Sequence, residues 1–300
     1  MSTKVQVGNP GSIVKLQKIN GFDIFNIIFL AVYGILIFYP FYNSVLVSFT
    51  PQATYVRNPF MLLPQDPNID SYRVVFSFRT IFTGYRTTII ITLIGVAYNI
   101  LLTVSAAFFF NKNFLLKKFF LIMIYFTLFF SGGLIPYYLL VRDLGLINNI
   151  FAMILPSGMN IMFMVVMRKY FAALPAELEE SAKLDGAGDL QILFRIILPL
   201  AVPMLVTFIL FYGVDRWNEW WNSMLFIREA SRQSLQHVLR GIIQASGAEM
   251  SSSIEEAGII PYVDGVRMAA VIVTMVPIMT VYPFLQKYFV QGLAIGAVKG

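Results

Sequence analysis

The sequence predicts an all-α membrane protein with six transmembrane helices. Hydrophobic residues make up 58% of the 300-residue chain and charged residues only 13%, which is about half of the charged fraction of a typical soluble domain. Six apolar runs reach the length of about 20 residues that a helix needs to cross a bilayer. Because a backbone in the bilayer core must satisfy its own hydrogen bonds, helices are the expected form of these runs.

The apolar runs fall within one transmembrane domain at 24–290. The first run has no small-x-small cleavage site and exceeds a signal-peptide core in length, so we interpret it as an uncleaved span. Two runs contain helix-breaking residues, at Ser131-Gly132-Gly133 and at Pro156-Ser157-Gly158, and such breaks are tolerated where they line a cavity or are covered by neighbouring helices. We expect spans at about 24–50, 87–110, 119–141, 144–167, 196–216 and 267–286.

The lysines orient the spans. With the N-terminus inside, all ten lysines fall in the inner segments 1–23, 111–118, 168–195 and 287–300, whereas the basic residues of the outer segments are arginines. Cytoplasmic loops of membrane proteins carry such an excess of basic residues. Both the N-terminal segment at 1–23 and the C-terminal tail at 291–300 are therefore expected to be cytoplasmic, in a multi-pass protein of the cell (inner, cytoplasmic) membrane.

Composition excludes several function classes. The chain has no cysteine and a single histidine, His237, so a metal cluster or a Ser/His/Asp triad lacks partners. The formal charge of +6 follows from the inner lysines and does not require nucleic acid. No GxxxxGK[ST] phosphate loop occurs. We expect no catalytic residues, no metal and no cofactor bound by this chain. Its expected surroundings are the lipid bilayer.

A charged segment at 174–199 separates the fourth and fifth runs. Pro175 suits the first position of a helix, and Gly186 can end that helix in a left-handed conformation. Asp189 can cap a second short helix. The segment therefore predicts a small helix–turn–helix outside the bilayer, although an ordinary loop between spans would also be polar.

The same segment resembles a known motif. The coupling loop of ABC-importer inner-membrane permeases has the pattern E-A-A, three residues, G, nine residues, I, one residue, L-P. Every spacing fits, with Ser181 in place of the middle alanine. Asp185 and Ala187, which flank the glycine, and the tail from Gln286 to Gly300 are similar to the carbohydrate (oligosaccharide) branch of these binding-protein-dependent systems. The matching residues are Glu180, Ala182, Gly186, Ile196, Leu198 and Pro199.

The resemblance implies a type I ABC-importer permease fold and a non-catalytic subunit that forms half of the translocation pathway for a sugar. The implied partners are a second homologous permease subunit, two ATP-binding subunits, an extracytoplasmic solute-binding protein and an oligosaccharide substrate. ATP and magnesium then belong to the partner ATPase. A loop at 172–199 would contact that ATPase, with Ala182 against its surface, through Glu180, Ser181, Ala182, Asp185, Gly186, Ala187, Ile196, Leu198 and Pro199.

All three tryptophans, Trp217, Trp220 and Trp221, lie at the outer end of the fifth run. They fit an aromatic belt at the lipid interface and equally a platform on which sugar rings stack. Arg216 is expected either to pair with Asp215 or to attract an anionic sugar. Polar residues inside the runs, such as Asn99 and Thr207, serve interhelical hydrogen bonding or substrate contact. The candidate substrate path comprises Trp217, Asn218, Glu219, Trp221, Asn160 and Tyr212.

The outer segment after the tryptophans shows helical spacing at Leu235, Val238, Leu239 and Ile242, which predicts a short surface helix. Two other functions stay open at this point. One is an ABC permease for peptides or amino acids. The other is a secondary transporter, which would require inverted repeats and coupling carboxylates in the membrane. The six charge-free runs, the fifth of which is 196–214, contain no carboxylate.

Overall fold

The computed structural model describes residues 3–4, 17–18, 20–59, 61–245 and 262–297. The chain divides into two compact units, Met1–Tyr72 with Pro261–Ala269 and Arg73–Ile260 with Ala270–Gly300. Much of the predicted N-terminal segment and the end of the predicted tail lie outside the described residues.

The first unit is built around α1 (Gly21–Ser48). The N-cap residue of this helix is Asn20, whose backbone N–H donates to the Asp23 carboxylate over 3.2 Å. A side chain that bonds to a free N–H at a helix start stabilises that end. Only Leu46, Val47 and Ser48 of this helix are buried, so the apolar surface of most of α1 suits contact with lipid.

The remaining elements of the first unit are short. A pair of two-residue strands, β1 (Thr3–Lys4) and β2 (Gln17–Lys18), pairs antiparallel, which the sequence did not predict. The helix α2 (Gln52–Arg57) follows α1. Two helices, α3 (Asp70–Ser77) and α15 (Val263–Ala297), begin in this unit and continue in the second.

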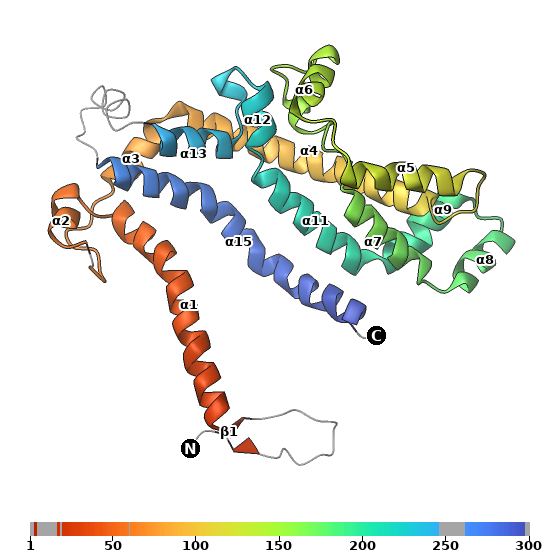
Figure 1. Cartoon of the computed structure of the whole chain (residues 1–300), viewed down its shortest axis with the longest axis horizontal. Coiled ribbons are helices and arrows are strands. Elements are labelled where there is room, and N and C mark those ends of the chain that lie inside the picture. The colour runs from red at the N-terminus through yellow and green to blue at the C-terminus, as the bar shows by residue number, and fades with distance from the viewer. Residues whose placement is uncertain (1–2, 5–16, 19, 60, 246–261, 298–300) are drawn as a thin grey trace. The chain divides into compact units, whose positions relative to one another are not determined.

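The second unit is organised around α4 (Arg79–Phe109). Two helices pack along it, α7 (Ile161–Ala172) and α11 (Val202–Trp217), as Figure 1 shows. Small residues of α4 permit this close packing: a Cβ built on Gly95 would lie 2.9 Å from the Arg216 side chain. The helix begins eight residues before the predicted span at 87, because its first turns are polar but still helical.

The outer segment packs on the same helix. Its elements are α12 (Trp221–Phe226), the 3₁₀ helix η3 (Ala230–Arg232) and α13 (Leu235–Gln244), so the predicted surface helix is confirmed. The Leu235 N–H donates to the Thr88 hydroxyl of α4 over 2.8 Å. A Cβ on Gly84 would lie 3.1 Å from the Leu235 backbone, which explains why α13 needs a glycine opposite it.

Both predicted helix breaks are present. The third run forms α5 (Lys117–Phe129) and α6 (Leu134–Asp143), which meet at an angle of 117°. Gly133 has a φ of +85° at this bend. The fourth run forms the 3₁₀ helix η1 (Ile150–Met153), an irregular segment and then α7. The third and fourth runs are therefore not single straight helices.

The fifth run bends at Ala201. The run begins within the π-helix η2 (Leu193–Ile197), which follows α9 (Asp189–Ile192), and continues through α10 (Leu198–Leu200). The part from Asp189 to Leu200 meets α11 at 84°. Pro199 and Pro203 have no N–H for the carbonyls four residues earlier, which accounts for the widened turn and the bend. The helix α11 continues past the charge-free run and includes Asp215 and Arg216, so a carboxylate does lie in this helix.

Among the described residues, three helices are long and apolar enough to cross a membrane: α1, α4 and the Val263–Thr280 part of α15. Counting each bent pair as one span raises the number to five. The structure thus shows an all-α membrane protein, with the short strand pair as its exception.

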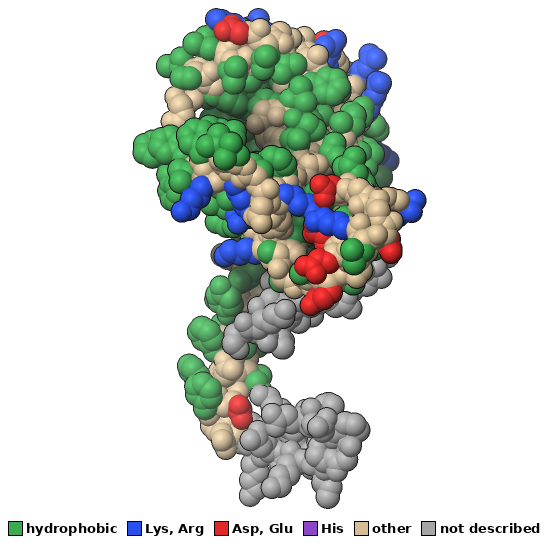
Figure 2. Space-filling model, turned by 90° about the vertical axis from the view of Figure 1, so that its right-hand side faces the viewer, with side chains coloured by type: hydrophobic (Ala, Val, Ile, Leu, Met, Phe, Trp, Pro, Cys, Tyr) green, Lys and Arg blue, Asp and Glu red, His purple; other side chains and the backbone are tan. Residues whose placement is uncertain are grey.

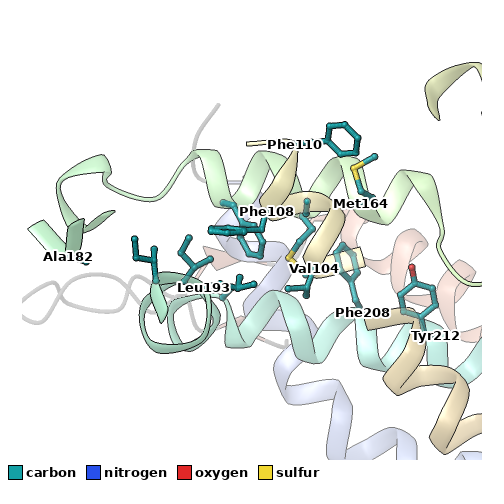
Figure 3. Packing of buried hydrophobic residues seen from close by; sticks show 14 residues of the cluster. Val104, Phe108, Phe110, Met164, Ala182, Leu193, Phe208 and Tyr212 are labelled. Carbon is teal, nitrogen blue, oxygen red and sulfur yellow. The ribbon is translucent and has the colours of Figure 1, made fainter. Parts of the chain in front are cut away.

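One apolar cluster joins the helices of the second unit. It extends from Tyr212 and Phe208 of α11, through Val104 and Phe108 of α4, to residues after α7 (Figure 3). Met164 and Met167 of α7 are fully buried in it. Figure 3 shows Ala182 at the far end of the same cluster, beyond Leu193.

Among the described residues, Arg216 has the largest of the fully buried side chains and is 1% exposed. Its Nε donates to Asn99 Oδ1 over 2.9 Å, and its Nη2 donates to the Ser157 carbonyl over 2.7 Å. The remaining guanidinium bonds reach the carbonyls of Met153 and Ile154. We call this set of contacts the Arg216 clasp; it ties α4, α11 and the irregular segment at 153–158 together.

The amide of Asn99 completes the clasp. Its Nδ2 donates to the carbonyls of Ser157 and Gly158 over 2.7 and 2.8 Å. Helical and sheet partners are missing in an irregular segment, so its buried carbonyls need side-chain donors. Arg216 and Asn99 supply these donors, which explains how an irregular segment is stable between apolar helices.

We expect Arg216→Met to destabilise the protein by on the order of 3 kcal/mol, because several buried carbonyls would lose charged donors at once. Thermal unfolding of the protein purified in detergent measures the effect. The matched control is Arg142→Met, because Arg142 is an exposed residue paired with its neighbour Asp143, and surface pairs contribute little. Equal unfolding temperatures for the two variants would show that the clasp is not a major source of stability.

Candidate functional site

The charged segment forms the predicted helix–turn–helix. Its first helix is α8 (Ala176–Leu184), preceded by Pro175 at the N-cap position. Glu177 and Glu179 lie in the first turn, where the helix dipole favours negative charge. The prediction of Pro175 as the first helical residue was wrong by one position, since its ψ of 126° is not helical.

The turn after α8 depends on Gly186. Its φ is +80°, the left-handed conformation that the sequence predicted. The Gly186 N–H donates to the Lys183 carbonyl, and the Ala187 N–H donates to the Ala182 carbonyl over 2.9 Å. A Cβ at Gly186 would meet no atom within 4 Å. Glycine is thus required by backbone conformation rather than by crowding inside this chain.

The second short helix starts differently from the prediction. Gly188 occupies the N-cap of α9, and Asp189 is its first residue. The Asp189 carboxylate accepts from Lys112 over 3.0 Å and does not cap the helix. The prediction of Asp189 as the cap was therefore wrong, because an ion pair uses its side chain.

Lys112 attaches the helix–turn–helix to the end of α4. Its ammonium contacts both Glu179 and Asp189, and it lies 4.5 Å from the centre of the Phe108 ring. Lys183 adds a second contact to Glu179 at 2.7 Å. Figure 2 shows acidic side chains beside Lys and Arg at this end of the protein. The ion pairs bring the segments 111–118 and 168–195 to one end of the second unit.

These charges also determine the protonation states of Glu179 and Lys183. Burial alone would raise the pKa of Glu179, but the hydrogen bonds and charges of Lys112 and Lys183 outweigh it and hold that pKa below its usual range. The hydrogen bond and charge of Glu179 in turn raise the pKa of Lys183. Glu179 is consequently an anion at neutral pH, as its ion pairs with two lysines require.

The residues of the coupling-loop motif divide into two sets. One set faces solvent and consists of Glu180, Ser181, Asp185, Gly186 and Pro199. The other packs within this chain and consists of Ala182, Ala187, Ile196 and Leu198. Ala182 is only 9% exposed, in the apolar cluster, so the expectation that it lies against a partner surface was wrong.

A hollow lies beneath α8. It has a volume of about 580 Å³ and is lined by Phe108 and Lys112 on one side and by Leu178, Glu179 and Leu200 among others. The helix α8 is therefore held at its edges by ion pairs and by Ala182 rather than packed along its whole length.

A second pocket lies between the start of α7 and the end of α11, with a volume of about 660 Å³. The stacked rings of Phe163 and Phe211, whose centres are 5.6 Å apart, form part of its apolar wall. Its other lining residues are Ser157, Met159, Asn160, Leu210, Tyr212, Val214, Asp215 and Asn218.

Three residues of the candidate substrate path, Asn160, Tyr212 and Asn218, line this pocket. Asn160 caps α7, since its Oδ1 accepts from the N–H groups of Met162 and Phe163. The Tyr212 hydroxyl bonds to Thr103 over 2.7 Å and accepts from the Asn160 N–H. Tyr212 therefore joins the two walls of the pocket to α4.

The other three residues of the candidate substrate path lie outside this pocket. The Trp217 indole donates to the Thr274 carbonyl of α15 over 3.4 Å. Glu219 accepts from the backbone N–H and the side-chain amide of Asn222, each over 2.9 Å. Trp221 is 43% exposed, edge-on to Trp220. The tryptophans thus do not form one platform in this chain.

Sequence reasoning missed most of the pocket. Phe211, Asp215 and Asn218 are four and then three positions apart along α11, so they share one helix face. That spacing is visible in the sequence. It was missed because the charge-free run ends at Val214, so Asp215 and Asn218 were not assigned to the same helix as Phe211. Both predictions for Arg216 were wrong: its guanidinium is buried in the clasp, where it donates to Asn99 and to backbone carbonyls instead of to Asp215 or a sugar.

Comparison with known proteins identifies the family. The family model of the binding-protein-dependent transport system inner membrane component matches residues 99–295, a region that contains both the helix–turn–helix and the pocket. Protein LplC of Bacillus subtilis (strain 168) is 36% identical over 280 residues, which cover 93% of this chain and 95% of LplC.

Two further similar proteins support the same family. The polygalacturonan/rhamnogalacturonan transport system permease protein YtcP of the same organism is 34% identical over 281 residues, covering 93% of this chain and 98% of YtcP. The crystal structure of a bacterial ABC transporter involved in the import of the acidic polysaccharide alginate matches with a TM-score of 0.84 and 31% identity, over 89% of this chain and 96% of that one. The chain belongs to the family of inner membrane components of binding-protein-dependent transport systems.

Proposed function

We propose that this chain is a permease subunit of an ATP-driven ABC importer and forms half of the translocation pathway for an oligosaccharide. The observation that carries the proposal is the coupling-loop motif on an exposed, ion-paired helix–turn–helix that continues directly into the helix lining a pocket. Relatives named for arabinooligosaccharides and for polygalacturonan/rhamnogalacturonan support a carbohydrate substrate.

The assembly we propose contains a second homologous permease, two ATP-binding subunits and an extracytoplasmic solute-binding protein. ATP and magnesium belong to the ATP-binding subunits. The exposed residues Glu180, Ser181, Asp185 and Gly186 face the ATPase, whereas Ala182 transmits its movement inward through this chain's own apolar cluster. The rigid path then runs through η2 and α10 to α11, one wall of the pocket.

The proposed topology has six spans with both termini inside. The ion pairs of Lys112 with Glu179 and Asp189 support it, because they join two segments that the lysine distribution puts on the same side of the membrane. In this arrangement the bent third and fifth runs and the irregular fourth run each count as one span, and the pocket opens toward the pathway between the two permeases.

Gly186→Leu is expected to reduce binding-protein-stimulated ATP hydrolysis at least tenfold. A side chain at φ +80° costs on the order of 1–2 kcal/mol, and leucine cannot keep the turn that presents Asp185 and Glu180. Asn tolerates left-handed conformations, so Gly186→Asn at the same position is the control and should retain most of the activity. The measurement is ATPase activity of the reconstituted complex, with and without sugar-loaded binding protein. Full stimulation of the leucine variant would remove this turn from the coupling path.

Asn218→Ala is expected to lower the maximal uptake rate about tenfold, because one hydrogen bond to a sugar contributes about 1.4 kcal/mol. The control is Trp221→Ala, outside the pocket and largely exposed, which should leave uptake within about twofold of the original rate if that residue only faces lipid. Radiolabelled oligosaccharide uptake, normalised to assembled complex, gives both values. A loss in Trp221→Ala alone would move the substrate path from the pocket to the tryptophans.

A further inference from the structure

The pocket between α7 and α11 carries a negative charge. Of its ten lining residues, Asp215 alone carries a charged side chain. The neighbouring arginine does not balance it at the pocket wall, because the Arg216 guanidinium donates to Asn99 and to the carbonyls of Met153, Ile154 and Ser157. Any molecule that enters therefore meets an anion and no cationic hydrogen-bond donor.

The neutral polar groups of the pocket offer both donors and acceptors. Asn218 uses one N–H of its Nδ2 on the Val214 carbonyl, which leaves its Oδ1 as an acceptor and its second N–H as a donor. The Tyr212 hydroxyl is already engaged by Thr103 and the Asn160 N–H. The Nδ2 of Asn160, whose Oδ1 caps α7, is a second amide donor, and the Ser157 hydroxyl, which accepts from Asn222 Nδ2, keeps its own O–H as a donor. The donors among the lining residues are therefore all neutral, and Asp215 supplies the one ionic group.

Neutral sugars and anionic sugars would differ in how well they bind to this pocket. The hydroxyls of a neutral sugar are donors, and two adjacent hydroxyls can bond to one carboxylate, while the C–H face of a pyranose suits the Phe163 and Phe211 rings. A uronate carboxylate is an anion and accepts only. Beside Asp215 it would be repelled, and its charge would find no cationic partner among the lining residues.

We propose that the Asp215 pocket selects neutral, hydroxyl-rich sugar units and rejects uronates. The inference rests on the proposed function, since it names the substrate class of the same pathway. It separates this chain from two of its relatives, whose names specify polygalacturonan and alginate. Asp215 then acts as a specificity-determining residue, and its exclusion of anions is as important as its bonds to hydroxyls.

Direct binding to the assembled complex tests the proposal without the selectivity of the binding protein. Saturation-transfer difference NMR would be recorded on the complex in lipid nanodiscs, with an equimolar mixture of xylotetraose and tetragalacturonate. We expect signals from xylotetraose only. In Asp215→Asn the xylotetraose signal should fall at least fivefold, and in Asp215→Lys tetragalacturonate should become the major ligand. Asp143→Asn, an exposed carboxylate outside the pocket, is the matched control and should behave as the original protein.

Three outcomes would overturn the inference: a stronger signal from tetragalacturonate than from xylotetraose in the original protein, the same ratio in all variants, or no signal from either sugar. Binding-protein-stimulated ATPase activity of the same nanodiscs, measured with a panel of neutral and uronate oligosaccharides, separates these outcomes from failure of the proposed function. If some oligosaccharide stimulates the ATPase, the chain remains a sugar permease and only the role of Asp215 is wrong. If none does, the proposed substrate class is wrong as well.

Discussion

The Arg216 clasp is the interaction on which the rest of the second unit depends. An irregular segment at 153–158 lies between α4 and α11, and its carbonyls have no partners in a helix or a sheet. Arg216 and Asn99 satisfy these carbonyls from both sides. Burying a charge is costly unless it is fully hydrogen-bonded, and here a cluster of carbonyl oxygens and one amide oxygen provide that environment. The clasp thereby fixes the end of α11, and with it Asp215 and Asn218, which line the pocket.

The opposite end of α11 shows how movement could reach that pocket. The prolines Pro199 and Pro203 flank the bend at Ala201, so the helix–turn–helix meets α11 at a defined angle. Ala182 and Leu193 belong to the same apolar cluster as Phe208 and Tyr212. Close-packed side chains transmit displacement because they have little free volume. Because of the hollow beneath it, α8 packs against the rest of the second unit along only part of its length.

The sequence predicted the helical class, the two helix breaks, the left-handed Gly186 and the short helix α13, because each depends on local residue types. It misplaced the cap of α9, since an ion pair with Lys112, 77 positions earlier in the chain, decides what Asp189 does. It also treated Arg216 as a possible sugar contact. Nothing in the local pattern reveals that an arginine at the end of an apolar run turns inward toward carbonyls of a distant segment. The exposed face of the coupling-loop motif was predictable, but the burial of Ala182 required the tertiary contacts.

The Arg216 clasp joins the segment at 153–158 to the end of α11, and we expect the two to move as one rigid wall during transport. The chain has no cysteine, so spin labels can be attached at Leu155→Cys and Asn218→Cys without removing any native residue of that type. Pulsed electron paramagnetic resonance on the reconstituted complex, without nucleotide and with trapped ATP, measures the distance between them. A single narrow distance, unchanged between the two states, is the predicted result. A distance that shifts or broadens when ATP is trapped would contradict the claim.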